Sequence, residues 1–149
     1  MSELHGVFPY LVSPLDDGGQ VRAEVLARLC DDLIGAGVHG LTPLGSTGEF
    51  AYLDRDQRAA IVRTAIAAAD KRVPVVLGVA APSPKEAEAL STHAATVGAS
   101  ALIALPPYVR RPKPPQLYEY YERIAKAADL PIILQNAAPP LGLGLDAPS

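Results

Sequence analysis

The chain has 149 residues, a mass of 15.6 kDa and a net charge of −3, which suits one compact domain. Its 49% hydrophobic content excludes a disordered tail, and a single cysteine excludes an internal disulfide. Without a block of Lys or Arg, there is no electrostatic reason to expect nucleic acid or a membrane surface as a partner. The first residues have neither a basic segment nor the apolar stretch of a signal peptide, and no apolar run is long enough for a membrane span, so we expect a cytoplasmic protein.

Four helices are expected from apolar residues at helical spacing. The first covers residues 21–34 and stops at Gly35 and Gly37. The second begins at Asp54, with Gln57 at the spacing of a capping box.

The third and fourth helices follow the same logic. Ser83 and the proline after it are an N-cap and a first-turn residue, Glu86 stands at the capping-box position, and Gly98 ends the helix. The fourth carries Leu117 and Ile124 on its apolar face.

Short, continuously apolar runs alternate with these helices, as expected of strands buried on both faces of a parallel sheet. Their starts are about 30 residues apart, the length of a βαβ unit. The sequence therefore predicts an α/β fold of about five strands and four helices, and residues 146–149 resemble the start of a further helix. The predicted strands begin near residues 6, 40, 74, 101 and 131.

Two architectures accommodate this pattern. One is a complete, open, doubly wound sheet, and the other is the first half of a (β/α)8 TIM barrel, whose full form takes about 250 residues. In both, ligands bind at the carboxyl ends of the strands. Candidate functional residues are therefore sought in the loops that follow the strands.

The loop after the second strand holds two hydroxyls between two glycines: Gly45, Ser46, Thr47 and Gly48. The glycines allow a sharp turn that exposes backbone N–H groups, and the hydroxyls add donors, so the loop could bind a carboxylate or phosphate oxygen. It lacks the lysine of a nucleotide-binding P-loop. A plain tight turn has the same composition.

Further candidates follow the fourth and fifth strands. Tyr108 lies in a proline-rich loop, where its phenol could relay a proton or its ring could simply pack on the prolines. Gln135 and Asn136 place two amides after the fifth strand. Amides orient a substrate but do not act as acid or base at neutral pH.

The remaining titratable residues indicate neither a metal site nor a cofactor. His5, His39 and His93 fall at the start of the first strand, before the second strand and in the third helix, so they are not expected to converge. No lysine lies directly at a strand end; all four fall in helices, at helix ends or in the proline-rich loop. The lysines are Lys71, Lys85, Lys113 and Lys126.

The motifs resemble the dihydrodipicolinate synthase and N-acetylneuraminate lyase family. The resemblance rests on the loop 45–49, on Pro107 and Tyr108, on the segment 130–136 and on the opening stretch 9–21. It implies that residues 1–149 are a partial TIM-barrel domain that ends before strand six. It also implies a lyase that acts on pyruvate or a related 2-oxo acid through a Schiff-base lysine on strand six, beyond this chain.

The resemblance implies roles for single residues. Thr47 and the backbone of the loop would hold the substrate carboxylate, Ser46 would supply a hydroxyl of the proton relay, and Tyr108 would belong to the same relay. Two positions depart from the synthases of the family, which have tyrosines where this chain has Val109 and Gln135. An arginine expected shortly after strand five is also missing from residues 137–142.

We therefore expect a relative that cleaves or dehydrates another 2-oxo acid, rather than the lysine-pathway synthase. Taken alone, these 149 residues are expected to be inactive, and the unpaired edges of a half barrel to cause homo-oligomer formation. Two alternatives remain: a flavodoxin-like module that binds a small anion without catalysis, and a truncated remnant that binds a partner protein.

Overall fold

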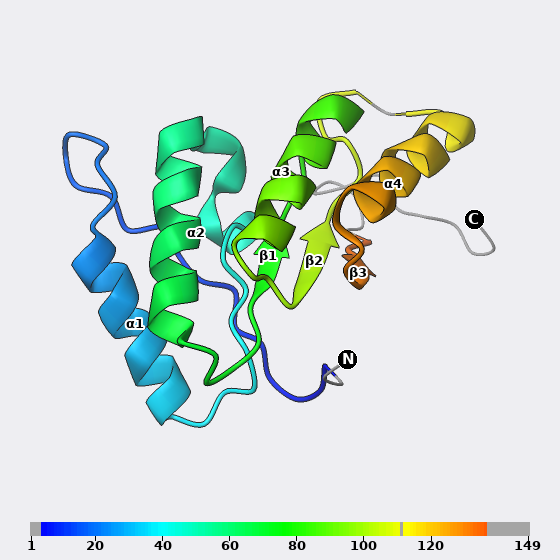
Figure 1. Ribbon diagram of the computed structural model, residues 1–149. Helices are drawn as coiled ribbons and strands as arrows, with labels where there is room; N and C mark the ends of the chain where they lie inside the picture. Colours follow the sequence, from blue (N-terminus) through cyan, green and yellow to red (C-terminus); the bar gives the residue numbers. More distant parts are fainter. Residues whose placement is uncertain (1–3, 111, 137–149) are drawn as a thin grey trace.

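The computed structural model describes residues 4–110 and 112–136. From residue 55 onward, helices and strands alternate along the chain (Figure 1). The α-helices are α1 (Ala23–Gly35), α2 (Arg55–Ala69), α3 (Pro84–Thr96) and α4 (Pro114–Ala128). The strands are β1 (Val76–Gly78), β2 (Ala101–Ala104) and β3 (Ile132–Leu134). Two short 3-10 turns, η1 (Ser46–Gly48) and η2 (Phe50–Tyr52), lie between α1 and α2.

The strands are parallel and pair in the order in which they occur in the chain, β1-β2-β3. Leu77 pairs with Leu102, and Ile103 pairs with Ile133. A doubly wound sheet reverses its strand order at a switch point. The described strands contain no such reversal, which is the arrangement that a barrel half requires.

The first two expected strands are extended segments joined by single bridges rather than ladders. Tyr10 bridges Thr42, and Leu41 bridges Val75, both in parallel. The predicted number of regular strands, five, is therefore larger than the three strands among the described residues. The reason is that Pro9 and Pro43 have no N–H to donate where the ladders would continue.

These two extended segments nevertheless lie beside β1 in the order in which they occur in the chain. The N–H of Leu41 donates to the carbonyl of Pro74 at 3.0 Å, and the N–H of Gly78 donates to the carbonyl of Pro43 at 3.1 Å. On the other side, the N–H of Thr42 donates to the carbonyl of Pro9 at 3.0 Å. Five parallel segments thus lie side by side, and their carboxyl ends meet at one edge.

The predicted helix caps are largely confirmed. The side chains of Asp54 and Gln57 form a reciprocal capping box at the start of α2. The Ser83 hydroxyl accepts a hydrogen bond from the N–H of Glu86 at 3.3 Å. Glu86, however, completes no capping box, because its carboxylate lies towards α2, 3.8 Å from an arginine there. The C-terminal stop of α1 is also confirmed, since Gly37 has a φ of 88°.

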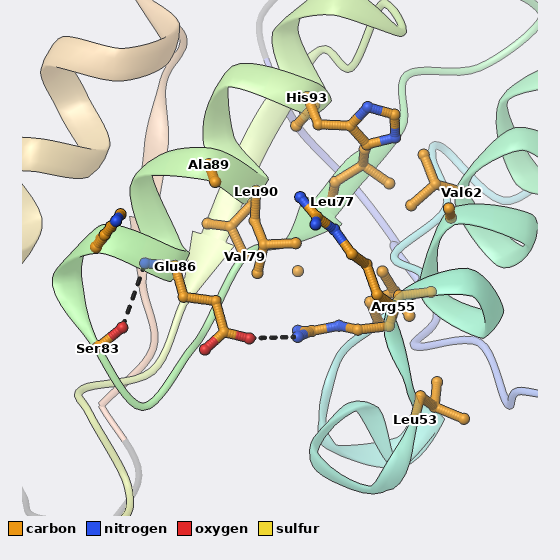
Figure 2. A pocket seen from close by; sticks show the side chains of 16 residues that line it. Leu53, Arg55, Val62, Leu77, Val79, Ser83, Glu86, Ala89, Leu90 and His93 are labelled. Atoms are coloured by element: carbon orange, nitrogen blue, oxygen red, sulfur yellow. Dashed lines mark hydrogen bonds and ion pairs between the residues drawn. The ribbon is translucent and has the colours of Figure 1, made fainter.

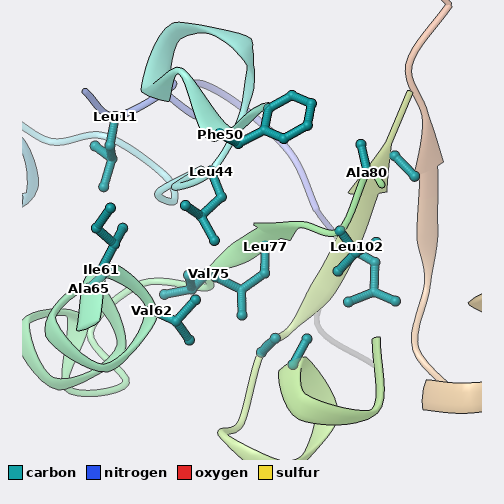
Figure 3. Packing of buried hydrophobic residues seen from close by; sticks show 14 of the residues in the cluster. Leu11, Leu44, Phe50, Ile61, Val62, Ala65, Val75, Leu77, Ala80 and Leu102 are labelled. Atoms are coloured by element: carbon teal, nitrogen blue, oxygen red, sulfur yellow. The ribbon is translucent and has the colours of Figure 1, made fainter. Parts of the chain in front are cut away.

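Side chains alternate between the two faces of the sheet and form two apolar clusters. The larger cluster fills the space between the sheet and the helices and includes Leu77, Leu102 and Ile124 (Figure 3). Cys30 is buried within it, and burial, followed by the nearby Asp31 charge, raises the pKa of its thiol to about 11. Such a thiol is protonated at neutral pH and unreactive.

The smaller cluster lies on the opposite, inner face. Val76, Ala101 and Ile103 are buried there, and Phe8 and Tyr10 pack against them. In a closed barrel this face points to the barrel interior. The N-terminal segment therefore supplies aromatic side chains to the inside of the fold.

No helix among the described residues is long and apolar enough to cross a membrane. Two sequence expectations, the missing arginine in residues 137–142 and the further helix at 146–149, lie outside the described residues.

Candidate functional site

The loop from Gly45 to Glu49 is a tight 3-10 turn at the carboxyl end of the second extended segment. The N–H of Gly48 donates to the carbonyl of Gly45, and the N–H of Glu49 donates to the carbonyl of Ser46, both at 3.0 Å. The N–H groups of Ser46 and Thr47 open the turn and so have no carbonyl partner within it. Both side chains are exposed, which leaves two hydroxyls and two N–H groups free to meet a ligand.

Close packing holds this turn in place. A Cβ on Gly78 would lie 1.9 Å from the carbonyl oxygen of Leu44, so only glycine lets β1 approach the backbone here. A Cβ on Gly45 would lie 2.1 Å from the Tyr10 ring. The Ser13 hydroxyl donates to the carbonyl of Gly48 at 2.7 Å. The turn is thus fixed by two neighbouring segments, the N-terminal segment and β1, before any ligand arrives.

Tyr108 follows β2 and contacts the segment that carries the turn. Its ring meets the ring of Phe50, on η2, edge to face at a centroid distance of 5.5 Å. The sequence suggested that the Tyr108 ring packs on the neighbouring prolines. It did not predict the contact with the Phe50 ring. Burial raises the pKa of the Tyr108 phenol, whereas the charge of Arg58 acts to lower it. With 41% of its surface exposed, Tyr108 remains accessible from solvent.

Arg58 is a buried charged residue that the sequence analysis missed. Its Nη2 donates to the carbonyl of Ala80 at 3.0 Å, and its guanidinium lies 5.5 Å from the centre of the Phe50 ring. Glu86 stands 3.8 Å from Nη1, while Nε is buried without a hydrogen-bond partner. A signal did exist, because Arg58 continues the buried stripe of Ile61 and its successors backwards by one helical turn.

Tyr120 is a second residue that the sequence analysis missed. It is fully buried on α4, and its hydroxyl accepts a hydrogen bond from the N–H of Ala81 at 3.1 Å. Burial raises the pKa of this phenol to about 12. Tyr120 therefore anchors α4 to the chain that leaves β1, and it stays neutral at physiological pH.

A cavity of about 560 Å³ lies between α2 and α3 (Figure 2). Apolar side chains such as Leu53, Val62 and Leu90 form its walls. Arg55 and Glu86 add charges at its rim. The cavity arises because the helices pack as two pairs, α1 with α2 and α3 with α4.

The two amides predicted after the fifth strand lie at the same sheet edge. The N–H of Gln135 donates to the carbonyl of Ala104 at 3.0 Å, which extends the pairing of β3 with β2. Gln135 is partly buried and Asn136 is exposed. In the order of parallel segments, they lie three positions away from the turn at Gly45. The structure thus brings Tyr108 to the turn region through Phe50, and it places the amides further along the edge.

The histidines differ in part from expectation. His93 lies apart on α3, but the rings of His5 and His39 meet at a centroid distance of 5.4 Å. The His39 Nδ1 accepts a hydrogen bond from the N–H of Val7 at 3.1 Å, so this pair ties the N-terminal segment to the next one. Within residues 4–110 and 112–136, no group of three His, Cys, Asp or Glu residues could hold a metal ion.

Comparison with known proteins identifies the family. The sequence profile of the dihydrodipicolinate synthetase family matches residues 3–142. The chain is 38% identical over 136 residues to the probable 2-dehydro-3-deoxy-D-pentonate aldolase YjhH of Escherichia coli K12, covering 91% of this chain and 45% of that protein. It is 42% identical over 131 residues to the 4-hydroxy-tetrahydrodipicolinate synthase of Phenylobacterium zucineum, covering 88% and 44%.

Solved structures agree. YagE, a prophage protein of Escherichia coli K12 that belongs to the dihydrodipicolinic acid synthase family and was crystallised with pyruvate, superimposes with a TM-score of 0.87 at 39% identity. The match covers 91% of this chain and 45% of YagE. The chain thus spans just under half the length of the proteins it matches. With a family profile over nearly all of its residues, the chain belongs to the dihydrodipicolinate synthetase family.

Proposed function

We propose that these residues are the N-terminal part of a lyase that acts on pyruvate or a related 2-oxo acid. The observation that carries the proposal is the fixed turn at Ser46 and Thr47, which offers two N–H groups and two hydroxyls at the carboxyl ends of the strands. Four such donors suit a carboxylate, which accepts several hydrogen bonds. The aldolase relative and the pyruvate complex of YagE support a substrate of this class.

In this proposal, Thr47 and the backbone from Gly45 to Gly48 hold the substrate carboxylate. Ser46 and Tyr108 carry protons to and from the reacting end, and the amides of Gln135 and Asn136 orient it. Tyr108 suits the relay because it reaches solvent while its ring rests on Phe50. Gln135 serves in positioning alone, since an amide does not titrate near neutral pH.

The covalent step needs an amine that this chain does not place at the site. Its lysines lie on or beside helices: Lys71 after α2, Lys85 on α3, and Lys113 and Lys126 at either end of α4. We infer that the Schiff-base lysine lies beyond residue 149, as the family resemblance implies, and that these residues alone do not turn over substrate. A Schiff base forms when the amine adds to the 2-oxo carbon and water leaves, and the resulting iminium stabilises a carbanion on the adjacent carbon.

The reaction is proposed to differ from that of the lysine-pathway synthase. A relative with that name is 42% identical, so overall identity does not separate the two activities. Two single positions support the distinction. Val109 and Gln135 stand where the synthases are expected to have tyrosines, and neither side chain can transfer a proton. An aldol cleavage or dehydration of another 2-oxo acid is therefore the preferred reaction.

Calorimetric titration with pyruvate tests the carboxylate site. We expect binding by the unaltered chain and at least a tenfold loss in Thr47→Val, because one hydroxyl donor is removed at constant shape. Thr92→Val is the matched control, since the Thr92 hydroxyl is bonded to the Glu88 carbonyl on α3, away from the strand ends. Equal binding by both variants would contradict the proposal.

Two further titrations separate the alternatives. Acetate and inorganic phosphate are expected to bind at least tenfold more weakly than pyruvate if the site recognises a 2-oxo acid. Equal affinity for all three would instead favour a general anion-binding module. Borohydride treatment with pyruvate should leave the mass of the chain unchanged, and an adduct on one of the four lysines would contradict the inferred place of the amine.

A further inference from the structure

Three side chains from three segments form a continuous stack behind the turn. The guanidinium of Arg58 faces the Phe50 ring at 5.5 Å, and the same ring meets Tyr108 edge to face at 5.5 Å. Arg58 is 7% exposed, whereas Tyr108 is 41% exposed. The stack therefore runs from a buried cation to a phenol that reaches solvent.

Packing alone does not account for an arginine at this place. Its neighbours on the same stripe of α2, Ile61, Val62 and Ala65, are apolar. The buried Nε has no hydrogen-bond partner, and an unpaired buried donor costs stability. Local departures of this kind are expected where a residue serves function rather than folding.

The contacts of Arg58 also fix its direction. Nη2 is held by the Ala80 carbonyl at 3.0 Å, and Nη1 faces the Glu86 carboxylate at 3.8 Å. These two contacts come from the chain after β1 and from α3. They hold the planar group over the face of Phe50, where a cation is attracted by the ring electrons.

We propose that Arg58 is a positioning residue that acts through the Phe50 ring to hold Tyr108 at the carboxyl ends of the strands and to keep a positive charge near its phenol. The inference rests on the proposed relay role of Tyr108. It adds a residue that touches no substrate but sets where the relay phenol stands and how readily it gives up its proton.

The charges around Tyr108 support this role. Burial is the largest influence and raises the pKa of Tyr108; Arg58 on α2 lowers it and Glu86 on α3 raises it. Tyr120 on α4 also interacts with Tyr108 electrostatically. Arg58 therefore counteracts the effect of burial, and Glu86 works in the opposite direction.

The test follows the titration of Tyr108 by NMR in the full chain with ¹³C-labelled tyrosine rings, with the Tyr108 signal assigned by Tyr108→Phe. Arg58→Gln removes the charge, so the Tyr108 midpoint should move to higher pH. Glu86→Gln should move it to lower pH, while Arg58→Lys should stay near the original midpoint.

A second readout needs no titration. At pH 7, ring-to-ring nuclear Overhauser effects between Phe50 and Tyr108 should be present in the unaltered chain and lost or weakened at least twofold in Arg58→Gln. If Arg58→Gln does not fold, Arg58→Lys decides. It keeps the charge but loses the planar group held over Phe50, so the Overhauser effects should weaken while the Tyr108 midpoint stays. Unchanged Overhauser effects would overturn the positioning role.

Midpoint shifts in the same direction for Arg58→Gln and Glu86→Gln, or no shift in either, would overturn the inference. If Arg58 had a purely structural role, the direction of the Tyr108 midpoint shift would not depend on the charge removed. These readouts need no substrate. Failure of pyruvate binding with opposite shifts present would reject the proposed function alone, and binding without the opposite shifts would reject the role of Arg58 alone.

Discussion

The turn at Gly45–Gly48 and the carboxyl end of β3 lie at the same end of the sheet, but neighbouring segments hold them to different extents. The turn is fixed by Ser13, by the Tyr10 ring and by the close approach of Gly78. In β3, Ile133 and Leu134 are 41% and 52% exposed, and the described residues pair this strand on one side only, with β2. One part of the candidate site is preorganised, whereas the other has an exposed face and, within residues 4–110 and 112–136, one unpaired side.

This contrast separates what the chain can do alone from what it needs a neighbour to do. A turn that its neighbours already hold in place loses little freedom when a carboxylate binds. An exposed apolar strand with a free edge favours association with another chain. We propose accordingly that these 149 residues, taken alone, form a homo-oligomer through the face that includes β3, where the proposed strand six would otherwise pair.

The largest effect is expected from comparing β3 with β2, the buried strand with which it pairs. Leu102→Ala on β2 should lower the free energy of unfolding by about 2–5 kcal/mol, because the side chain is fully buried in the larger cluster. Leu134→Ala on β3 should cost about 1 kcal/mol or less, because half of its surface is already exposed. Urea unfolding measures both, and equal costs would show that β3 is as well buried as β2.

Support of the turn is tested next. Gly78→Ala should lower the free energy of unfolding by about 1–3 kcal/mol, because the new Cβ meets the Leu44 carbonyl. Gly35→Ala is the matched control, since nothing lies within 4 Å of the site of its Cβ at the end of α1. That change should be neutral or slightly stabilising. A tolerated Gly78→Ala would mean that the turn is not held by β1.

Alkaline pH should weaken the fold through Tyr120. Its pKa rises from the usual 10.0 to about 12 on burial, so between these pH values the folded chain keeps a proton that the unfolded chain has released. Stability from this group is complete below pH 10 and falls by up to about 1.4 kcal/mol per pH unit above it. Urea unfolding at pH 9–11 should show a shallower fall in Tyr120→Phe, and an unchanged slope would contradict this account.

The smallest effect on stability, and a clear one on association, is expected at β3. Leu134→Lys places a charge on the exposed strand, which native proteins use to block edge pairing. Sedimentation velocity should show a shift towards monomer with little change in unfolding. Tyr118→Lys on α4 is a control of similar exposure that should leave the association unchanged. An unaltered chain that is already monomeric would count against the proposed oligomer.

Much of the helical half of the fold was predictable because its signals are local. The capping box of Asp54 and Gln57 and the Ser83 cap are encoded within four residues each, and the structure contains both caps. The first two strands were predicted as regular because their apolar runs resemble the others. Whether Pro9 and Pro43 interrupt a ladder depends on which neighbour needs their N–H, and sequence does not specify this.

The candidate site was predictable only in its loops. Ser46, Thr47 and Tyr108 follow strands, so a rule about strand ends finds them. Arg58 and Tyr120 lie inside helices, and their roles depend on contacts with the chain after β1, at Ala80 and Ala81, which are distant from them in sequence. A charged residue on a buried helical stripe is the signal that would have found Arg58.

The central claim is that the turn at Ser46 and Thr47 binds the carboxylate of a 2-oxo acid. Amide chemical-shift mapping of the full chain with pyruvate tests it most directly, because it shows which residues respond. We predict that the largest changes fall on the amides of Ser46, Thr47 and Gly48. If the largest changes fell instead on Arg55 and Lys85, around the cavity between α2 and α3, the claim would be contradicted and the anion would bind there.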